Sequence, residues 1–284
     1  MRAFEFDDVQ SGLLLRSVPH PQPEEGQVII QVKAAGLCLL DLFTLQDDQY
    51  GMILKRPIVL GHEIAGIIVK LGQGVSDPKV GERVSLKAIG LGYDGGYAEQ
   101  AMAWVDNLIR IPTGVSFAQA VVAADSISTA YHAVITGGRD CAGGTVATVG
   151  LGGLGFAAIQ IAALQGAKVY GLEIDASKLP LAQKLGAIEC AGGLGQCVNI
   201  ACDTVDDFAG ANITTLTALN TAKSTVSIGA NLDELKEVLR LIDDGHLCPI
   251  LEIHFHSIPQ GLERLILGRV TWRLFANPSV NGFE

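Results

Sequence analysis

The chain has 284 residues and a formal net charge of −10 at pH 7, from 30 acidic and 20 basic residues. Hydrophobic residues make up 49% and charged residues 18%, so a globally disordered chain is excluded. The acidic excess argues against a nucleic-acid-binding protein, because a polyanion is bound by a basic face. The 34 glycines predict many tight turns and places where the backbone approaches a ligand.

Three features of the sequence indicate the cellular compartment and whether the chain spans a membrane. The first residues have neither the basic nor the apolar segment of a secretory signal. The 6 cysteines are scattered without a CxxC pair, as in proteins of a reducing compartment. The uncharged stretch 142–167 is long enough to span a bilayer, but its glycines and glutamines favour a different structure. We therefore expect a cytoplasmic protein without a membrane span.

The pattern of the chain changes along its length. Apolar runs at 28–34 and 64–71, bounded by turn residues, predict a small β-rich domain over roughly the first 110 residues. Residues 117–138 are typical of a helix that ends at two glycines. The pattern then becomes strand, glycine turn, helix, strand and helix, which predicts a parallel α/β sheet. From about residue 251, strand-like alternation returns.

The glycine turn is the most specific local motif. A buried strand over 145–149 is predicted to run directly into a GxGxxG turn, and a helix over 156–164 follows. In this context the glycines allow a tight turn, approach of a pyrophosphate to the backbone, and close packing of helix on strand. The helix N-terminus offers N–H groups to the same pyrophosphate. The cofactor-binding residues predicted here are Gly150, Gly152, Gly153, Leu154 and Gly155.

An acidic residue ends the next predicted strand and selects the cofactor. Glu173 lies 18 residues after the last glycine of the turn and would accept hydrogen bonds from the adenosine ribose. Its carboxylate would repel a 2′-phosphate, so NAD is favoured over NADP. Lys178 would contact the ribose or the phosphate, or else be a solvated helix residue, and the sequence leaves this open.

The first domain holds a second set of candidate residues. Cys38 lies in AAGLC and His62 lies in GHE, and a thiolate with an imidazole is a good start for a zinc site. Taken alone, a cysteine such as Cys38 is more often a buried small hydrophobe, and a histidine such as His62 is more often a hydrogen-bonded core residue.

Several motifs occur in the order typical of the zinc-type medium-chain alcohol dehydrogenases. They are the segment 35–41, PIVLGHEIAG at 57–66, VGERV at 80–84, DGGYAE at 94–99 and the glycine turn. The chain resembles this family over residues 1 to about 278. The resemblance implies an α/β protein, with a GroES-like β-rich catalytic domain and an inserted Rossmann domain, a doubly wound parallel sheet. We expect them over 1–115 with 251–284 and over 116–250, respectively.

The resemblance also implies a catalytic zinc site. Cys38 and His62 match the first two zinc ligands, and Glu63 matches the acid that supports or exchanges with them. Asp41 matches the acid that orients the ligand histidine. The third ligand position, often Cys, holds Asp125 here, as in a subgroup common among fungal sequences. A helix-surface acid is the alternative interpretation of Asp125.

Further positions carry less certain roles by the same resemblance. Thr129 matches the threonine beside the nicotinamide, and Arg273 roughly matches a late arginine near the metal. Leu40 occupies the place of the Ser or Thr that relays the alcohol proton, and leucine cannot relay a proton. A water molecule or another residue such as His132 would replace the relay, or catalysis is impaired. His132 is otherwise interpreted as an ordinary helix histidine.

The chain departs from the family in two regions. Residues 85–93 contain no cysteine, so we expect one catalytic zinc and no structural zinc. The region 218–229 is shorter than in the family, which predicts the loss of one parallel strand of the usual six. His254 and His256 have no third ligand nearby in sequence and are interpreted as surface residues.

The expected function is zinc-dependent hydride transfer between an alcohol, or the matching aldehyde or ketone, and NAD(H). Two alternatives remain open: a zinc-free reductase of the quinone or enoyl type, and a nucleotide-binding relative with impaired catalysis. The expected partners are a small-molecule substrate and a second copy in a homodimer.

Overall fold

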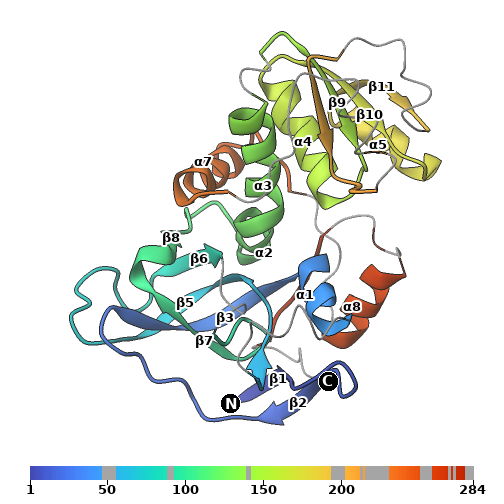
Figure 1. Cartoon of the computed structure of the whole chain (residues 1–284). Helices are drawn as coiled ribbons and strands as arrows, with labels where there is room; N and C mark the ends of the chain where they lie inside the picture. The colour runs from blue at the N-terminus through green and yellow to red at the C-terminus, as the bar shows by residue number, and fades with distance from the viewer. Residues whose placement is uncertain are drawn as a thin grey trace. The chain divides into compact units, whose positions relative to one another are not determined.

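The structure is a computed structural model. It describes residues 1–46, 56–87, 93–138, 142–192, 202–211, 214, 230–249, 258–267, 270 and 273–278. The chain divides into two compact units, one formed by Met1–Ala124 with Leu251–Glu284 and the other by Asp125–Ile250 (Figure 1). The chain therefore leaves the first unit and returns to it. The domain limits given above, 1–115 with 251–284 and 116–250, remain a prediction.

Antiparallel strands dominate the first unit. The smaller sheet has the order β2-β1-β4, and the larger has the order β13-β3-β5-β6-β8, with β7 also paired to β3. The smaller sheet comprises β1 (Arg2–Phe6), β2 (Leu13–Ser17) and β4 (Ile58–Val59). The larger comprises β3 (Gln27–Leu37), β5 (Glu63–Leu71), β6 (Arg83–Lys87), β7 (Gln100–Trp104), β8 (Leu108–Arg110) and β13 (Leu274–Ala276).

One apolar core joins the two sheets. Side chains from β1, β3, β4 and β5 are fully buried in it, among them Phe6, Ile30, Leu37, Ile58 and Ile64. Burial of apolar area on this scale is the main favourable term in folding. Because β3 and β5 face this core, the ends of both strands are held in fixed positions.

Three described helices belong to the first unit. They are α1 (Leu39–Gln46), α2 (Phe117–Val122) and α8 (Ile258–Ile266), with a 3-10 turn at Val105–Asn107. Helix α2 begins at a capping box, in which Ser116 and Gln119 each bond the other's backbone N–H. Helix α8 packs on α1.

Helix α8 corrects one prediction. We expect strand-like alternation from residue 251 onward, but residues Ile258–Ile266 form a helix. Ile258 and Leu262 are four residues apart and both are buried, which is the spacing of one helix face. The following strand, β13, agrees with the expected alternation.

The second unit contains a parallel sheet with the order β11-β10-β9-β12. Its strands are β9 (Thr145–Val149), β10 (Lys168–Leu172), β11 (Ala187–Ala191) and β12 (Thr204–Asp207). The chain moves outward from β9 to β11 and then returns to the other side of β9. The switch point between β9 and β12 is where open α/β sheets bind their ligands. The fold is therefore the α/β architecture that the sequence predicts.

Helices accompany this sheet. They are α3 (Ser128–Tyr131), α4 (Gly153–Leu164), α5 (Leu179–Lys184) and α7 (Leu232–Asp243), with a 3-10 turn at Ala176–Lys178. The helix predicted over 117–138 contains two π-helical segments, Ala123–Ile127 and His132–Gly137. None of the described helices is long and apolar enough to cross a bilayer. The uncharged stretch 142–167 forms β9, the glycine turn and α4.

Two sequence predictions lie outside the described residues. One is the lost parallel strand, which concerns the region 218–229, and the other is the surface position of His254 and His256.

Candidate active site

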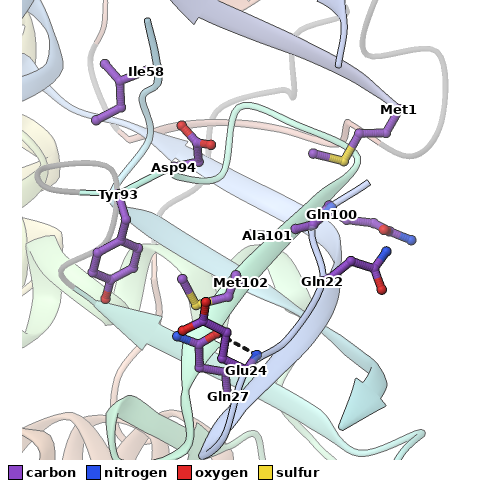
Figure 2. Close-up of a pocket in the computed structure, with 11 residues that line it drawn as sticks. Met1, Gln22, Glu24, Gln27, Ile58, Tyr93, Asp94, Gln100, Ala101 and Met102 are labelled. Atoms are coloured by element: carbon purple, nitrogen blue, oxygen red, sulfur yellow. Dashed lines mark hydrogen bonds between the residues drawn. The ribbon is translucent and has the colours of Figure 1, made fainter. Parts of the chain in front are cut away.

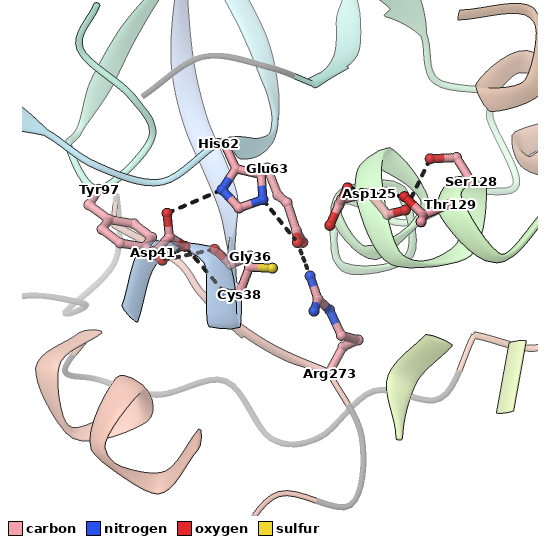
Figure 3. A network of polar contacts seen from close by, with 10 residues as sticks. All are labelled: Gly36, Cys38, Asp41, His62, Glu63, Tyr97, Asp125, Ser128, Thr129 and Arg273. Atoms are coloured by element: carbon pink, nitrogen blue, oxygen red, sulfur yellow. Dashed lines mark hydrogen bonds and ion pairs between the residues drawn. The ribbon is translucent and has the colours of Figure 1, made fainter. Parts of the chain in front are cut away.

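The first group of candidate residues lies where β3 ends and β5 begins. The two strands are antiparallel, with Ala35 opposite Ile64, so Cys38 after β3 comes close to His62 and Glu63 at the start of β5 (Figure 3). Gly36 permits this approach, because a Cβ there would lie 2.0 Å from Oε2 of Glu63. The antiparallel pairing of β3 with β5 thus brings the GHE motif close to Cys38.

Asp41 connects three of the surrounding groups. Its Oδ1 lies 3.1 Å from Nδ1 of His62, while its Oδ2 accepts the Tyr97 hydroxyl at 2.7 Å and the Cys38 N–H at 3.3 Å. Asp41 and His62 are buried, with 1% and 3% of their surface exposed. Burial, together with the carboxylate of Asp41, raises the pKa of Tyr97 well above its usual value. Tyr97 is therefore a neutral donor. A hydrogen bond from Nδ1–H of His62 to Asp41 would leave the lone pair of Nε2 available to a metal.

Glu63 is completely buried and forms an ion pair with Arg273. The two residues are 210 positions apart in sequence. Pairing of β13 with β3 brings them together, because Leu274 lies opposite Leu37. A buried carboxylate needs such a partner, since an isolated buried charge is strongly destabilising. Nε2 of His62 lies 3.8 Å from Oε1 of the same glutamate.

Four side chains form a group with the donor chemistry of a metal site. Ligand atoms of Cys38, His62, Glu63 and Asp125 all lie within 4.8 Å of one another (Figure 3). Asp125 directly follows Ala124 in the π-helical segment that continues α2, and its Oδ1 accepts the Thr129 hydroxyl at 3.3 Å. A thiolate, an imidazole and carboxylates are the ligands that zinc prefers. The residues present therefore fit a zinc ion.

In the glycine turn of the second unit, a different glycine accounts for the tight turn, for the space for a pyrophosphate and for the close packing of the helix. Gly150 has φ +84°, a left-handed conformation that favours glycine. A Cβ on Gly155 would lie 2.1 Å from the Gly150 carbonyl oxygen, so α4 packs directly on the turn. A Cβ on Gly152 would meet no atom within 4 Å. Gly152 is also the N-cap of α4 and provides no capping side chain. Backbone N–H groups of Gly153 and Leu154 thus begin a helix at an open surface, as an anion site requires.

Glu173 is held against this turn. Its carboxylate accepts the N–H of Leu151 at 2.9 Å and the N–H of Asp175 at 3.1 Å, and it lies 3.3 Å from Nζ of Lys178. The ion pair is largely buried, with side-chain exposures of 9% for Glu173 and 17% for Lys178. Lys178 is therefore a partner of the acid rather than a solvated helix residue.

Two residues proposed for proton transfer lie in different surroundings. Leu40 is half-buried in the first turn of α1. His132 has Nδ1 at 2.7 Å from Glu234, which also accepts the Thr136 hydroxyl at 2.6 Å. These contacts fix His132 to α7 within the second unit and favour its interpretation as a structural helix histidine.

Sequence reasoning did not single out Tyr97 or Gly36. Tyr97 stands inside the DGGYAE motif, and its hydroxyl makes the shortest contact of Asp41. The available signal was an aromatic residue with a polar tip directly after two glycines.

The first unit also contains a cavity of about 410 Å³ (Figure 2). Its lining includes Glu24, Gln27, Tyr93, Asp94 and Met102. The N–H of Glu24 donates to Oε1 of Gln27 at 2.9 Å across one side of it. None of its lining residues belongs to the metal group, so this cavity has no part in the chemistry proposed below.

Comparison with known proteins agrees with this fold. The model of the alcohol dehydrogenase GroES-like domain matches residues 24–113. An alcohol dehydrogenase of Geobacillus stearothermophilus is 32% identical over 66% of this chain and 62% of its own length. The matched segment covers 60% to 64% of the length of three such curated relatives.

Solved structures extend the likeness to both units. The acetophenone reductase of Geotrichum candidum, determined in complex with NAD, is 27% identical with a TM-score of 0.87, covering 98% of this chain and 97% of that one. The alcohol dehydrogenase of Aeropyrum pernix shares the fold, with a TM-score of 0.88 at 24% identity over 98% of this chain and 100% of that one. The chain is therefore similar to alcohol dehydrogenases in both units, and its residues 24–113 match their GroES-like domain.

Proposed function

We propose that the protein is a zinc-dependent oxidoreductase that transfers a hydride between NAD(H) and an alcohol, or the matching aldehyde or ketone. The observation that carries the proposal is the group of Cys38, His62, Glu63 and Asp125, whose ligand atoms lie within 4.8 Å of one another. The alcohol dehydrogenase and the NAD-bound acetophenone reductase named above support the reaction class and the cofactor.

The metal would be held by Cys38, His62 and Asp125, with Glu63 or water in the fourth place. A bound zinc supplies a Lewis acid that polarises the substrate oxygen and lowers the pKa of an alcohol. Asp41 fixes the tautomer and direction of His62. Arg273 neutralises Glu63, which weakens the glutamate as a permanent ligand and leaves room for the substrate oxygen.

The nicotinamide cofactor would bind to the second unit. Its pyrophosphate would approach Gly152 and the N–H groups of Gly153 and Leu154, and its adenosine ribose would bind to Glu173. Thr129 would contact the nicotinamide. The carboxylate of Glu173 supports NAD over NADP, because a 2′-phosphate would face a negative charge. Its neighbour Lys178 is already paired with it.

Leu40 restricts how the alcohol proton leaves. A leucine has no group that accepts or donates a proton. We therefore assign the proton to a water molecule beside the substrate, rather than to a side chain at this position. A cytoplasmic location and a homodimer are further parts of the proposal.

The proposal is tested by metal analysis of the purified protein, coupled to NAD(H) turnover with a panel of alcohols, aldehydes and ketones. We expect one zinc per chain and turnover. Turnover without zinc would favour a zinc-free reductase, and NADH binding without turnover would favour a non-catalytic relative.

The role of Asp125 has its own matched comparison. We expect Asp125→Ala to weaken zinc binding at least tenfold, about 1.4 kcal/mol, and to abolish turnover, because an oxygen ligand is lost. Asp106→Ala is the control, since Asp106 is an exposed acid of the first unit outside the metal group. Full zinc occupancy in Asp125→Ala would show that another residue provides the third ligand.

A further inference from the structure

Two polar residues lie buried in the middle of the parallel sheet. Thr148 of β9 and Asp206 of β12 are register partners on neighbouring strands. Thr148 is completely buried, and 6% of the surface of Asp206 is exposed. Oγ1 of Thr148 and Oδ2 of Asp206 have no hydrogen-bond partner within the described part of the chain. Such groups are rare in proteins and require an explanation.

Among the described residues, the strand and helix next to Asp206 provide no compensating charge. Burial alone raises the pKa of Asp206 to about 7. The adjacent strand β9 and helix α4 have no ionisable side chain. On β12 itself, Asp207 accepts the N–H groups of Ala209 and Gly210, and on the loop before it Asp203 accepts the Thr145 N–H. Past the turn, Glu173 is paired with Lys178.

This pair lies directly beneath the glycine turn. Thr148 precedes Gly150 by two residues, and its Cγ2 is 3.5 Å from where a Cβ of Gly155 would be. The loop after β12 also contacts the turn, because a Cβ on Gly150 would lie 2.7 Å from the N atom of Ala209. Any shift of β12 against β9 is therefore transmitted to the turn.

We propose that Asp206 is a positioning residue of the cofactor site, which keeps the glycine turn able to bind a pyrophosphate only while its carboxyl group is protonated. The inference rests on the proposed binding of NAD(H) at this turn.

Two physical effects explain why ionisation of Asp206 would weaken the binding of a pyrophosphate at the turn. An ionised carboxylate on β12, the strand beside the one that leads into the turn, repels the negatively charged pyrophosphate. A charge without a partner inside the sheet must also gain water, which displaces β12 and the loop that contacts Gly150. The neutral carboxyl group has neither effect.

The test is the affinity of the full-length protein for NADH, measured by nicotinamide fluorescence at pH 6 and pH 8 and constant ionic strength. If only the protonated form binds, the dissociation constant rises about tenfold over this interval, because the competent fraction falls from about nine-tenths to about one-tenth. Asp206→Asn should bind with similar affinity at both pH values. Asp206→Leu provides a second neutral side chain if the asparagine variant does not fold.

Asp203→Asn is the control, because Asp203 is an exposed acid just before the same strand. It should keep the pH dependence of the parent. An equal affinity of the parent at both pH values, or an unchanged pH dependence in both Asp206 variants, would overturn the inference while leaving NAD(H) binding intact. Absence of NADH binding by the parent at every pH would instead contradict the proposed function, and this inference with it.

Discussion

Asp41 is the residue on which the geometry of the metal group depends. It accepts hydrogen bonds from Tyr97 and from the backbone of Cys38, and it lies against His62, all in a buried environment. In Asp41→Ala, the Tyr97 hydroxyl and Nδ1 of His62 lose the carboxylate that they contact. We expect a loss of about 1–3 kcal/mol in the free energy of unfolding. Zinc affinity should fall about 10–100-fold, because the ligand histidine is no longer oriented.

Denaturant titration and competition with a metal chelator measure the two effects separately. Tyr97→Phe is the matched variant, because it keeps the buried ring and removes only the hydroxyl. We expect it to lose about 1 kcal/mol of stability and to bind zinc almost as tightly as the parent. Parent-like zinc affinity in Asp41→Ala would show that the histidine is held by other contacts.

At the scale of the element, the connection from β9 to α4 separates packing from ligand binding. A Cβ on Gly155 would lie 2.1 Å from a backbone oxygen, whereas a Cβ on Gly152 would meet open space. We expect Gly155→Ala to destabilise the protein by about 1–3 kcal/mol or more, because α4 must move away from the turn. Gly152→Ala should cost less, about 0.5–1 kcal/mol, because alanine is a poorer N-cap residue than glycine but meets no neighbouring atom here.

NADH binding should be lost in both glycine variants, for different reasons. In Gly152→Ala the added methyl group occupies the space of the pyrophosphate on an otherwise native fold. Thermal unfolding combined with NADH titration distinguishes a loss of binding caused by an unstable fold from one caused by a blocked site. A stable Gly152→Ala variant that binds NADH normally would contradict the assignment of the pyrophosphate to this turn.

The same elements show what could be predicted from the sequence. The connection from β9 through the turn to α4 is correct in detail because all its determinants are local: an apolar strand, glycines at fixed spacing and an apolar helix. Helix α8 was interpreted as strand-like alternation, because short apolar segments fit either period until their packing partner is known. For α8 that partner is α1, far away in sequence.

The candidate site also contains residues that could be predicted from the sequence and residues that could not. Cys38, His62 and Asp125 could be named because motifs mark them. The hydrogen bond from Tyr97 to Asp41 could not be predicted, because it spans 56 residues and depends on how the sheet brings two loops together. The buried position of Asp206 was also missed, since an acidic pair at the end of a strand usually indicates an exposed strand end.

At the scale of the whole molecule, Asp206 makes stability depend on pH. Its folded pKa of about 7 lies above the ordinary pKa of an aspartate, 3.8, so the folded state binds the proton more tightly than the unfolded state. Between these values the folded state holds more protons, and the contribution of this group to stability falls as the pH rises. The total change is on the order of 4 kcal/mol.

Other carboxyl groups make the folded state more stable as the pH rises. The contribution of Asp206 is therefore measured as the difference in the free energy of unfolding between Asp206→Asn and the parent. Hydrogen bonds lower the pKa of Asp77 and Glu237, for example, and their contributions to stability are lost as the pH falls. We expect the free energy of unfolding of Asp206→Asn, relative to the parent, to increase from pH 5 to pH 8. Denaturant titrations at several pH values measure it, with Asp203→Asn as the reference. A difference that is constant over this interval would show that Asp206 is ionised in the folded protein.

The pairing of β13 with β3 has a consequence for the order in which the chain is made. Strand β3 is synthesised before the second unit, whereas its partner β13 is synthesised after it. The second unit can fold as soon as it emerges, while the first still has an open edge along the end of β3. During that interval Glu63 lacks Arg273, and a nascent chain contains a buried acid without its counter-charge. A zinc ion at the proposed site would therefore be bound only after β13 has joined the sheet.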